Sequence, residues 1–420
     1  MIEFRDYQQG IIDSGSDILK KHGFLYLAME VRTGKTFTSL GIASKLGFKK
    51  VLFLTKKKAI SSIESDYVKM GKPFFMFTIN YESIHKTPDV CWDLIILDET
   101  HGLGAFPKPS KRAKEVKALM MKIKPRVIML SGTPTPESYS QMYHQVYGIP
   151  RNPFSEFANF YKFAHAYVNI KQKIINGFRS NDYSDGSKKI IEKMAPYTIS
   201  YTQQEAGFES KINEHFLECT LKQSTYDLIA RLKKDLVIEG KEEVLLADTG
   251  VKLMSKLHQL FSGTVKFESG KSMVVDDSKA MFIKEHFKDQ KIGIFYKFTA
   301  ELEALKSVFG DMLCTELEEF DTTDKNIALQ IVSGREGISL RNAESLVYFN
   351  IDFSATSYWQ SRDRMTTIDR PENNVYWVFS KKGIESQIYK AVSKKKNYTI
   401  NHFKKDFVNK GINDRTGNSE

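Results

Sequence analysis

The stretch Glu30-Val31-Arg32-Thr33-Gly34-Lys35-Thr36 decides how this 420-residue chain is interpreted. It lies between a short apolar run at 24–28 and a segment at 37–46 that is compatible with a helix. A strand, a loop and a helix in this order are the setting of a phosphate-binding loop, because the backbone amides that open the helix point at the anion.

Three residues of this loop have a defined task in such a site. Gly34 lets the backbone approach an oxyanion, Lys35 reaches the β- and γ-phosphates, and the Thr36 hydroxyl completes the shell of a Mg²⁺ ion. The full pattern has a glycine five residues before Gly34, where this chain has Met29. For the loop on its own, a turn followed by a helix N-cap therefore stays open as the alternative.

A second block further along the chain carries two adjacent carboxylates. Residues 92–97 form a nearly unbroken apolar run, the pattern of a buried parallel strand, and Asp98 and Glu99 follow it directly. Asp98 would hold magnesium through water, and Glu99 would orient and deprotonate the attacking water. An acidic surface turn is the alternative for this block alone. Together with the phosphate loop, the pair predicts a nucleoside triphosphatase.

The composition is that of a basic globular protein. Hydrophobic residues make up 41% and charged residues 27%, and Lys plus Arg outnumber Asp plus Glu by 62 to 51. The net charge of +11 suggests a polyanionic partner, although many soluble proteins are equally basic. Cys91, Cys219 and Cys314 are too widely spaced for a disulfide framework or a zinc site, so a reducing, cytoplasmic compartment is expected. No run approaches the roughly 18 apolar residues that span a membrane, so no membrane association is expected.

Strand and helix signals alternate along both halves of the chain. In the first half, strand signals lie at 51–55, 74–79, 92–97 and 126–130. In the second half they lie at 214–220, 291–296, 328–332, 345–350 and 375–379. Strands that end in polar or small residues and are separated by helical lengths favour doubly wound parallel sheets, so the chain is predicted to be α/β.

Two segments have a different character. At the N-terminus the Gln8 amide has the donor and acceptor needed to read the Hoogsteen edge of adenine, although a glutamine early in a helix is usually just solvated. Between 151 and 210, aromatic rings recur at helical spacing among lysines. They could form an accessory nucleic-acid surface, but the favoured interpretation is a helical insertion whose rings pack inward. Residues 181–187, rich in Asp, Gly and Ser, are predicted to be a mobile loop.

Taken together, these blocks resemble the two-domain motor of superfamily-two helicases, in particular the Swi/Snf-type DNA translocases in their compact phage-encoded form. The resemblance covers nearly the whole chain, and the blocks follow the family's order. They are 4–8 (adenine motif), 30–36 (motif I), 51–58 (Ia), 98–101 (II), 131–136 (III), 292–298 (IV), 333–340 (V) and 360–370 (VI). The resemblance implies two RecA-like doubly wound domains that use ATP and Mg²⁺. They would be a first domain at 1–150, an aromatic and basic helical insertion at 151–210 that completes it, and a second domain at 211–420.

The resemblance also implies roles for individual residues. Gln360 would face the γ-phosphate, and Arg364 occupies the position of the first arginine finger, so hydrolysis would require closure of the two domains. His101 and Thr133 would couple the nucleotide state to the second domain, and Gly334 and Gly337 would allow close backbone approach. The implied nucleotide contacts are Arg5, Gln8, Arg32, Thr33, Gly34, Lys35, Thr36, Gly337 and Arg370.

Three positions depart from the family's pattern. Arg32 stands where these translocases usually have glycine, Thr367 stands at the expected second arginine finger, and Asp369 replaces a small residue. Arg370 lies about one helical turn beyond Thr367, so we expect it to be the substitute rather than Arg362, which faces elsewhere on the helix.

DNA would contact loops at the top of both domains. Backbone amides and side chains there suit phosphates, so binding should tolerate any sequence and weaken with salt, although each lysine alone could be a solvated surface charge. The expected DNA-binding residues are Thr55, Lys56, Asn80, Tyr81, Lys297 and Ser339.

The sequence therefore predicts an ATP- and Mg²⁺-dependent DNA motor that tracks one strand of a duplex and remodels it. Fork regression, branch migration and protein displacement, in replication, recombination or repair, all fit. The open alternatives are an RNA-directed helicase and the ATPase motor or switch subunit of a restriction-type assembly. A catalytically dead DNA-binding module is disfavoured because Lys35, Asp98 and Glu99 are all present.

Overall fold

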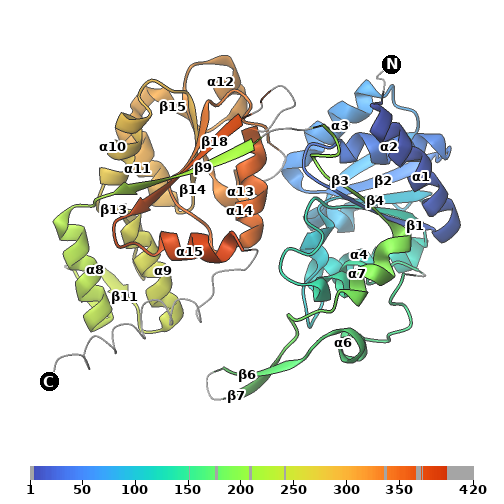
Figure 1. Cartoon of the computed structure of the whole chain (residues 1–420), viewed down its shortest axis with the longest axis horizontal. Helices are drawn as coiled ribbons and strands as arrows, with labels where there is room; N and C mark the ends of the chain where they lie inside the picture. Colours follow the sequence, from blue (N-terminus) through green and yellow to red (C-terminus); the bar gives the residue numbers. More distant parts are fainter. Residues whose placement is uncertain are drawn as a thin grey trace. The chain divides into compact units, whose positions relative to one another are not determined.

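The computed structural model divides into two compact units, residues 1–209 and 210–420, which are described separately (Figure 1). It describes residues 4–150, 152–175, 178–207, 211–240, 243–334, 338–365, 370 and 372–394. At 173–175, 178, 333, 334, 356, 360 and 363 only the backbone is described. Within these residues, no helix is both long and apolar enough to cross a membrane.

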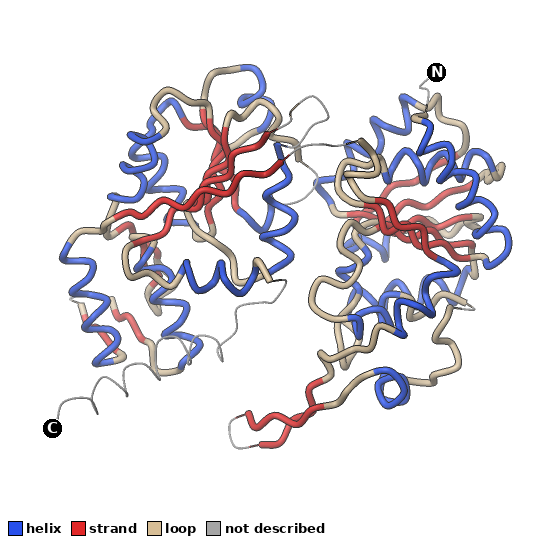
Figure 2. The backbone as a smooth tube through the Cα atoms, in the orientation of Figure 1, coloured by secondary structure: helices blue, strands red, loops and turns tan. Residues whose placement is uncertain are grey.

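The first unit is built on a six-stranded sheet in which every described pairing is parallel. The strand order is β3-β2-β4-β5-β1-β8, so the chain must cross over repeatedly and helices lie on both faces (Figure 2). The strands are β1 Phe24–Met29, β2 Lys50–Thr55, β3 Phe75–Asn80, β4 Leu94–Leu97, β5 Arg126–Leu130 and β8 Thr198–Tyr201. The helices are α1 Asp6–His22, α2 Lys35–Lys45, α3 Ile60–Lys69, α4 Lys111–Ile123, α5 Met142–Gln145, α6 Phe160–Tyr167 and α7 Lys189–Met194.

The second unit repeats this architecture with a six-stranded parallel sheet in the order β15-β16-β14-β17-β18-β9. Its strands are β9 Lys211–Cys219, β14 Ile292–Tyr296, β15 Leu313–Cys314, β16 Asn326–Gln330, β17 Ser345–Tyr348 and β18 Glu372–Ser380. Its helices are α8 Gln223–Asp235, α9 Gly250–Phe261, α10 Ser278–His286, α11 Thr299–Phe309, α12 Leu317–Thr322, α13 Ile331–Gly334, α14 Ala355–Ser361 and α15 Glu385–Val392. Two small antiparallel pairs accompany them: β10 Val237–Glu239 with β11 Val244–Leu246, and β12 Thr264–Lys266 with β13 Ser272–Val274.

The predicted fold class, two RecA-like doubly wound parallel sheets, is confirmed. The central strands of both sheets are buried on both faces, which explains why they are nearly continuous apolar runs rather than alternating ones; they are β1, β2, β4 and β5 in the first unit and β14 and β17 in the second. The run 94–97, for example, is fully buried along its whole length. Ala328 lies in β16 as predicted, but that strand ends at Gln330 and residues 331–334 form the short helix α13.

The segment between the two sheets contains more than helices. Phe154, Phe160 and Phe163 are buried, so these rings pack inward as predicted, while Tyr161 is exposed. An antiparallel hairpin, β6 Lys171–Ile175 and β7 Phe178–Asp182, projects from the first unit (Figure 1). The segment predicted as a mobile loop is partly the strand β7. Its remainder is held to the unit by hydrogen bonds from Ser140 Oγ to the Tyr183 carbonyl (2.6 Å) and from Asn169 Nδ2 to Asp185 (3.0 Å).

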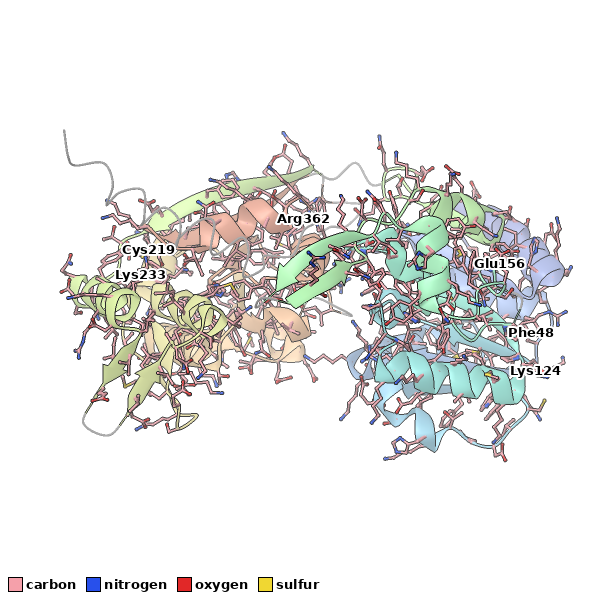
Figure 3. The ribbon with its side chains drawn as sticks, turned by 90° about the horizontal axis from the view of Figure 1, so that it is seen from below. Phe48, Lys124, Glu156, Cys219, Lys233 and Arg362 are labelled. Carbon is pink, nitrogen blue, oxygen red and sulfur yellow. The ribbon has the colours of Figure 1, made fainter. Side chains whose placement is uncertain are left out.

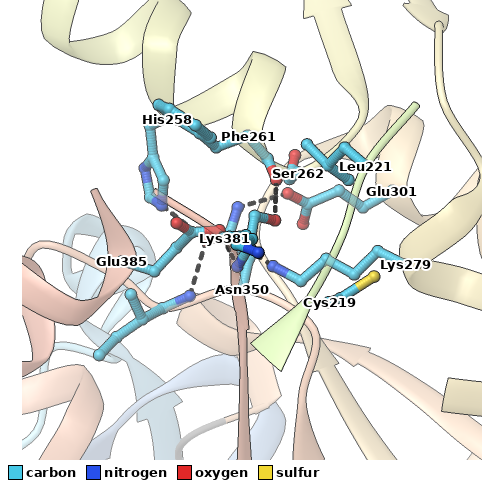
Figure 4. Close-up of polar contacts among 12 residues, drawn as sticks. Cys219, Leu221, His258, Phe261, Ser262, Lys279, Glu301, Asn350, Lys381 and Glu385 are labelled. Carbon is cyan, nitrogen blue, oxygen red and sulfur yellow. Dashed lines mark hydrogen bonds and ion pairs between the residues drawn. The ribbon is translucent and has the colours of Figure 1, made fainter. Parts of the chain in front are cut away.

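A buried ion pair ties two helices of the second unit together (Figure 4). Lys279 Nζ, on α10, lies 3.1 Å from Glu385 Oε1 at the start of α15, and both side chains are almost completely buried. The Lys279 ammonium also lies 5.4 Å from the centre of the Phe349 ring, just after β17. Each of these two charges is removed from water, and its burial is tolerated only because the opposite charge of the partner compensates for the lost hydration.

Removing one partner of this pair should destabilise the second unit strongly. We expect Lys279→Met to cost about 3–5 kcal/mol in the free energy of unfolding, because Glu385 is left buried without its cation. Urea unfolding followed by circular dichroism measures this, and Lys279→Met/Glu385→Leu should recover most of the loss. Lys45→Ala, which breaks the exposed pair with Asp13, is the matched control with little effect. A loss below about 1 kcal/mol for the single variant would show that the pair is not needed for stability.

Candidate nucleotide-binding site

The loop between β1 and α2 has the backbone geometry of an anion site. Gly34 is in the left-handed region (φ 82°, ψ 33°) and caps α2. A Cβ atom at this position would lie only 2.1 Å from Gln8 Nε2, so no other residue fits without displacing that side chain. The first N–H groups of α2 have no partner within the helix, and with the helix dipole they favour a negative charge in front of the loop.

Several contacts hold the loop in this shape. Glu30 accepts at its carbonyl from Lys35 Nζ (3.0 Å) and from Thr33 Oγ1 (2.8 Å). Tyr7, on α1, donates its hydroxyl to the Thr33 carbonyl (3.1 Å) and stacks on Tyr201 of β8 at 4.9 Å. Tyr7 and Tyr201 were missed from the sequence. An aromatic pair separated by almost two hundred residues has no local signal.

The side chain expected to read adenine lies beside the loop. Gln8 is 8% exposed, and its Oε1 accepts from the backbone N–H of Arg5 (3.1 Å) at the start of α1. The amide oxygen thus has a local partner, and Nε2 faces the Gly34 backbone. A role of Arg5 and Gln8 in binding the base stays a prediction.

Asp98 is a partly buried carboxyl at the carboxyl end of the sheet, directly after β4. Its Oδ2 accepts from Thr55 Oγ1 (2.8 Å) at the end of β2. Burial and the neighbouring Glu99 carboxylate raise the pKa of Asp98 to about 7, against the opposing effects of Thr55 and Lys35. A carboxylate that is costly to ionise here would be stabilised by a bound cation, so the residues present fit a Mg²⁺ ion held near Asp98 and Thr36.

Glu99 and His101 connect this edge to the loop after β5. Glu99 has a left-handed backbone (φ 51°, ψ 44°), a strained conformation for a non-glycine residue that is often found at functional sites. His101 Nδ1 lies 3.2 Å from both Glu99 Oε2 and Ser131 Oγ, and Ser131 Oγ accepts from the Thr133 N–H (3.2 Å). The Thr133 hydroxyl is buried and has no hydrogen-bond partner among the described residues. The candidate coupling residues His101 and Thr133 are therefore brought together through Ser131.

The raised pKa of Asp98 predicts a pH dependence of stability. The carboxyl ionises near pH 4 in the unfolded chain but only near pH 7 in the folded one, so stability is lost as the pH rises across this window. Asp98→Asn cannot ionise and escapes the loss. Without nucleotide or magnesium, its melting temperature relative to wild type should rise by roughly 5 °C between about pH 5 and about pH 7.5 and then stay constant. Thermal melts across this range measure the difference, and a difference independent of pH would contradict the raised pKa.

Two of the expected DNA-binding side chains instead support Asp98. Thr55 and Tyr81 are buried (0% and 1% exposed), and Tyr81 donates its hydroxyl to the Asp98 carbonyl (2.5 Å). In this structure neither is exposed for a contact with DNA. Lys56 is half-buried, and Asn80 donates to Glu82 Oε2 (3.0 Å) at the end of β3.

In the second unit, the candidate arginine finger follows α14. Arg364 is 6% exposed, its Nη1 donates to the Ile338 carbonyl (3.2 Å), and its own carbonyl accepts from the Leu340 N–H (2.8 Å). It thereby fixes the segment that carries Ser339, which is exposed. Of Gln360 only the backbone is described. Gly337, Thr367 and Asp369 lie outside the described residues.

The remaining predicted residues of the second unit have structural partners. Arg370 donates to the carbonyls of Ala343 (2.6 Å) and Glu344 (2.7 Å), the two residues directly before β17. Lys297 forms an ion pair with Asp352, and its ammonium lies 4.3 Å from the centre of the Phe353 ring. Burial alone would raise the pKa of Asp352, but the Lys297 charge holds it below its usual value.

Comparisons with known proteins give a likeness to solved structures only. No family model matches the chain, and no curated protein matches it. Two similar solved structures are the SWI2/SNF2 ATPase core of Sulfolobus solfataricus in complex with dsDNA and the ATPase core domain from the same organism. They are 15% and 16% identical to this chain with a TM-score of 0.43 each. The alignments cover 94% of this chain and 91% and 89% of theirs.

Proposed function

We propose that the chain is an ATP- and Mg²⁺-dependent motor of the Swi/Snf type that translocates on duplex or branched DNA. The single observation that supports this best is the convergence of three loops at one edge of the first sheet. Strands β4, β5 and β1 are neighbours, and their carboxyl ends lead into Asp98–Glu99, Ser131–Thr133 and the Gly34–Lys35 loop. In an open α/β sheet this edge is where ligands bind.

The chemistry assigned to these residues is phosphoryl transfer to water. When bound, Mg²⁺ neutralises the charge that develops between the β- and γ-phosphates. The α2 amides and Lys35 would hold the phosphates, Thr36 and Asp98 would hold the metal, and Thr55 would keep the Asp98 carboxyl oriented. Glu99 would accept a proton from the attacking water. Its contact with His101 links that step to the Ser131–Thr133 loop.

The second unit would supply positive charge to the transferring phosphoryl group. Arg364, on the short turn after α14, is the proposed finger. Its guanidinium is held in place by a hydrogen bond to the Ile338 carbonyl. Arg370 could substitute for the finger missing at Thr367 only by leaving the Ala343 and Glu344 carbonyls. If Arg370→Ala kept DNA-stimulated ATPase activity while Arg364→Ala abolished it, the proposal for Arg370 would be withdrawn.

The proposed biological task is the remodelling of DNA in replication, recombination or repair, by fork regression, branch migration or displacement of bound protein. A cytoplasmic, phage-encoded enzyme that works in the host is the form the sequence resembles. The rival functions are an RNA-directed helicase and the ATPase switch of a restriction-type assembly. Both would use the same phosphate loop, so the polymer that stimulates hydrolysis decides between them.

The test is ATP hydrolysis in the presence of different nucleic acids. We expect duplex, forked or four-way DNA to raise the turnover rate at least tenfold, and RNA of the same length to raise it less than twofold. The activation should weaken steeply with salt, because phosphate contacts dominate binding. Phosphate release assayed with single-stranded, duplex, forked and four-way DNA and duplex RNA measures this.

The outcomes of this test separate the rivals. Stronger activation by RNA than by DNA would replace the DNA motor with an RNA helicase. Hydrolysis that no nucleic acid changes would favour a switch subunit. The Lys35→Ala variant serves as the control for contaminating ATPase activity.

A further inference from the structure

Helix α4 of the first unit carries an unusual concentration of positive charge. Residues 108–126 contain eight basic residues and a single acidic one, Glu115. Lys111, Lys114 and Lys117 are spaced by three residues and so lie along one broad face of the helix, and Lys124 follows at its C-cap, so the four lysines extend over roughly 20 Å. In the described part of the chain, Lys114, Lys117 and Lys124 form no ion pair, and Lys111 has only a long contact with Glu115 (3.8 Å).

A cavity of about 410 Å³ opens beside the end of this row. Its rim carries Lys117 and Lys124, and the latter lies at the end of α4 (Figure 3). Its walls are mostly apolar and include four aromatic side chains: Tyr143, Tyr147, Phe154 and Phe157. The Lys117 ammonium lies 3.8 Å from the centre of the Tyr147 ring, so the charged rim and the aromatic wall are in direct contact.

The cavity is preformed rather than a gap in a loose loop. Gly148 lets the loop after α5 approach α4 so closely that a Cβ atom there would lie 2.6 Å from Lys117 Cα. Asn152 Oδ1 accepts from the Phe154 N–H (2.9 Å), and Tyr143 donates its hydroxyl to the Phe157 carbonyl (3.0 Å). These bonds fix the positions of the wall residues, so a ligand would bind without first ordering the loop.

The cavity also lies away from the candidate nucleotide site. The phosphate loop follows the carboxyl end of β1, whereas α4 runs back along the sheet and Lys124 lies just before the amino end of β5. Because β1 and β5 are parallel neighbours, the phosphate loop lies at the carboxyl ends of these strands and Lys124 lies at their amino ends, on the opposite side of the sheet's length. None of the groups assigned to ATP hydrolysis lines the cavity.

We propose that the lysine face of α4 and the cavity beside it bind a single strand of DNA. The phosphates lie along the lysines, and one unstacked base enters the aromatic cavity. A row of separate cations over roughly 20 Å matches a linear polyanion with regularly spaced charges better than it matches a small anion. Each phosphate of a DNA strand is accompanied by a flat aromatic base. Aromatic cavity walls can bind any of these bases by stacking.

This site deepens the proposed function by giving the first unit a second hold on DNA, for a strand outside the motor's own track. It rests on the proposed function only in that both name DNA as the partner. Binding is measured without nucleotide, so the test of this site does not depend on ATP hydrolysis. A chain without ATPase activity could still bind the strand here, and an active motor could fail to do so.

The experiment is fluorescence anisotropy of the full-length chain with a labelled oligothymidine of about 20 nucleotides. A second oligonucleotide of equal length, with abasic sites throughout, reports the contribution of the bases. Lys117→Ala/Lys124→Ala should weaken binding of the oligothymidine at least tenfold. It should also make the slope of log K against log salt shallower by about 1.4, since each phosphate contact on a single strand contributes about 0.7. Lys20→Ala/Lys21→Ala, which removes two exposed lysines from α1, is the matched control and should change binding less than twofold.

The cavity is tested with Tyr147→Leu, whose melting temperature is compared with wild type. Wild type should prefer the oligothymidine over the abasic strand at least fivefold, and Tyr147→Leu should reduce this preference below twofold. Unchanged affinity and salt slope in the double lysine variant would overturn the proposal, and so would an unchanged base preference in Tyr147→Leu. Equal binding of an acidic peptide with the same number of charges would also overturn it, because the surface would then be a protein-docking face.

Discussion

Lys35→Ala should reduce the rate of ATP hydrolysis by about 10²- to 10³-fold, the usual loss when one preorganised donor to a developing charge is removed. Lys35 opens α2, its ammonium is held toward the loop by the Glu30 carbonyl, and its charge acts to lower the pKa of the partly buried Asp98. Steady-state phosphate release at saturating ATP and DNA measures the loss.

Lys45→Ala is the matched control for this prediction, because it removes a lysine from the other end of the same helix. Lys45 is exposed and paired with Asp13, so the variant should hydrolyse ATP at the wild-type rate. If Lys35→Ala kept more than about a tenth of the wild-type rate, the loop would not be the phosphate site and the nucleotide would have to bind elsewhere.

Arg364→Ala should lower the turnover rate by about 10³-fold and leave the affinity for MgATP within about threefold of wild type. An arginine finger acts on charge that develops in the transition state, so its loss affects the rate of chemistry more than binding. Single-turnover hydrolysis and equilibrium titration with a fluorescent ATP analogue measure the two quantities separately.

Arg364 also has a structural task, so its variants need a control for folding. Its side chain donates a hydrogen bond to the Ile338 carbonyl. Arg364→Lys keeps a cation of similar reach. The melting temperature of each variant shows whether the loss of the Ile338 contact destabilises the fold. Arg341→Ala, which removes an exposed arginine next to the same segment, should not change the rate. Equal losses in rate and in ATP affinity for Arg364→Ala would show that the residue supports the fold rather than the reaction.

Much of the fold was predictable because the decisive signals are local. The apolar run before Asp98 and the Gly34–Lys35 pair each fall within about ten residues of sequence; the first predicts where β4 ends, and the second lies where α2 begins. One position that departs from the pattern of the resembling translocases has an informative backbone. Arg32 is left-handed (φ 66°), a conformation that glycine adopts without strain, so the position would suit the glycine usual in those proteins, and the structure does not explain the arginine.

The features that could not be predicted depend on contacts between distant segments. The support of Asp98 by Thr55 and Tyr81 requires β2, β3 and β4 to be neighbours. In the second unit, the ion pair between Lys297 and Asp352 requires β14 and β17 to be neighbours. Thr55 ends a strand, and Tyr81 and Lys297 directly follow strands, as residues of a loop that contacts DNA would; only their burial or ion pairing shows the other role. The β6–β7 hairpin did have a signal, since Asn176-Gly177 stands between its two strands in the sequence.

We propose that the Gly34–Lys35 loop and the Asp98–Glu99 pair form one Mg²⁺-dependent ATPase site that DNA activates. The most direct measurement is phosphate release by the unaltered chain during a titration with duplex DNA, repeated after magnesium is removed with a chelator. We expect a rate that rises with DNA, saturates, and falls to background without magnesium. A rate that is unaffected by both DNA and magnesium, or the absence of hydrolysis under all conditions, would contradict it.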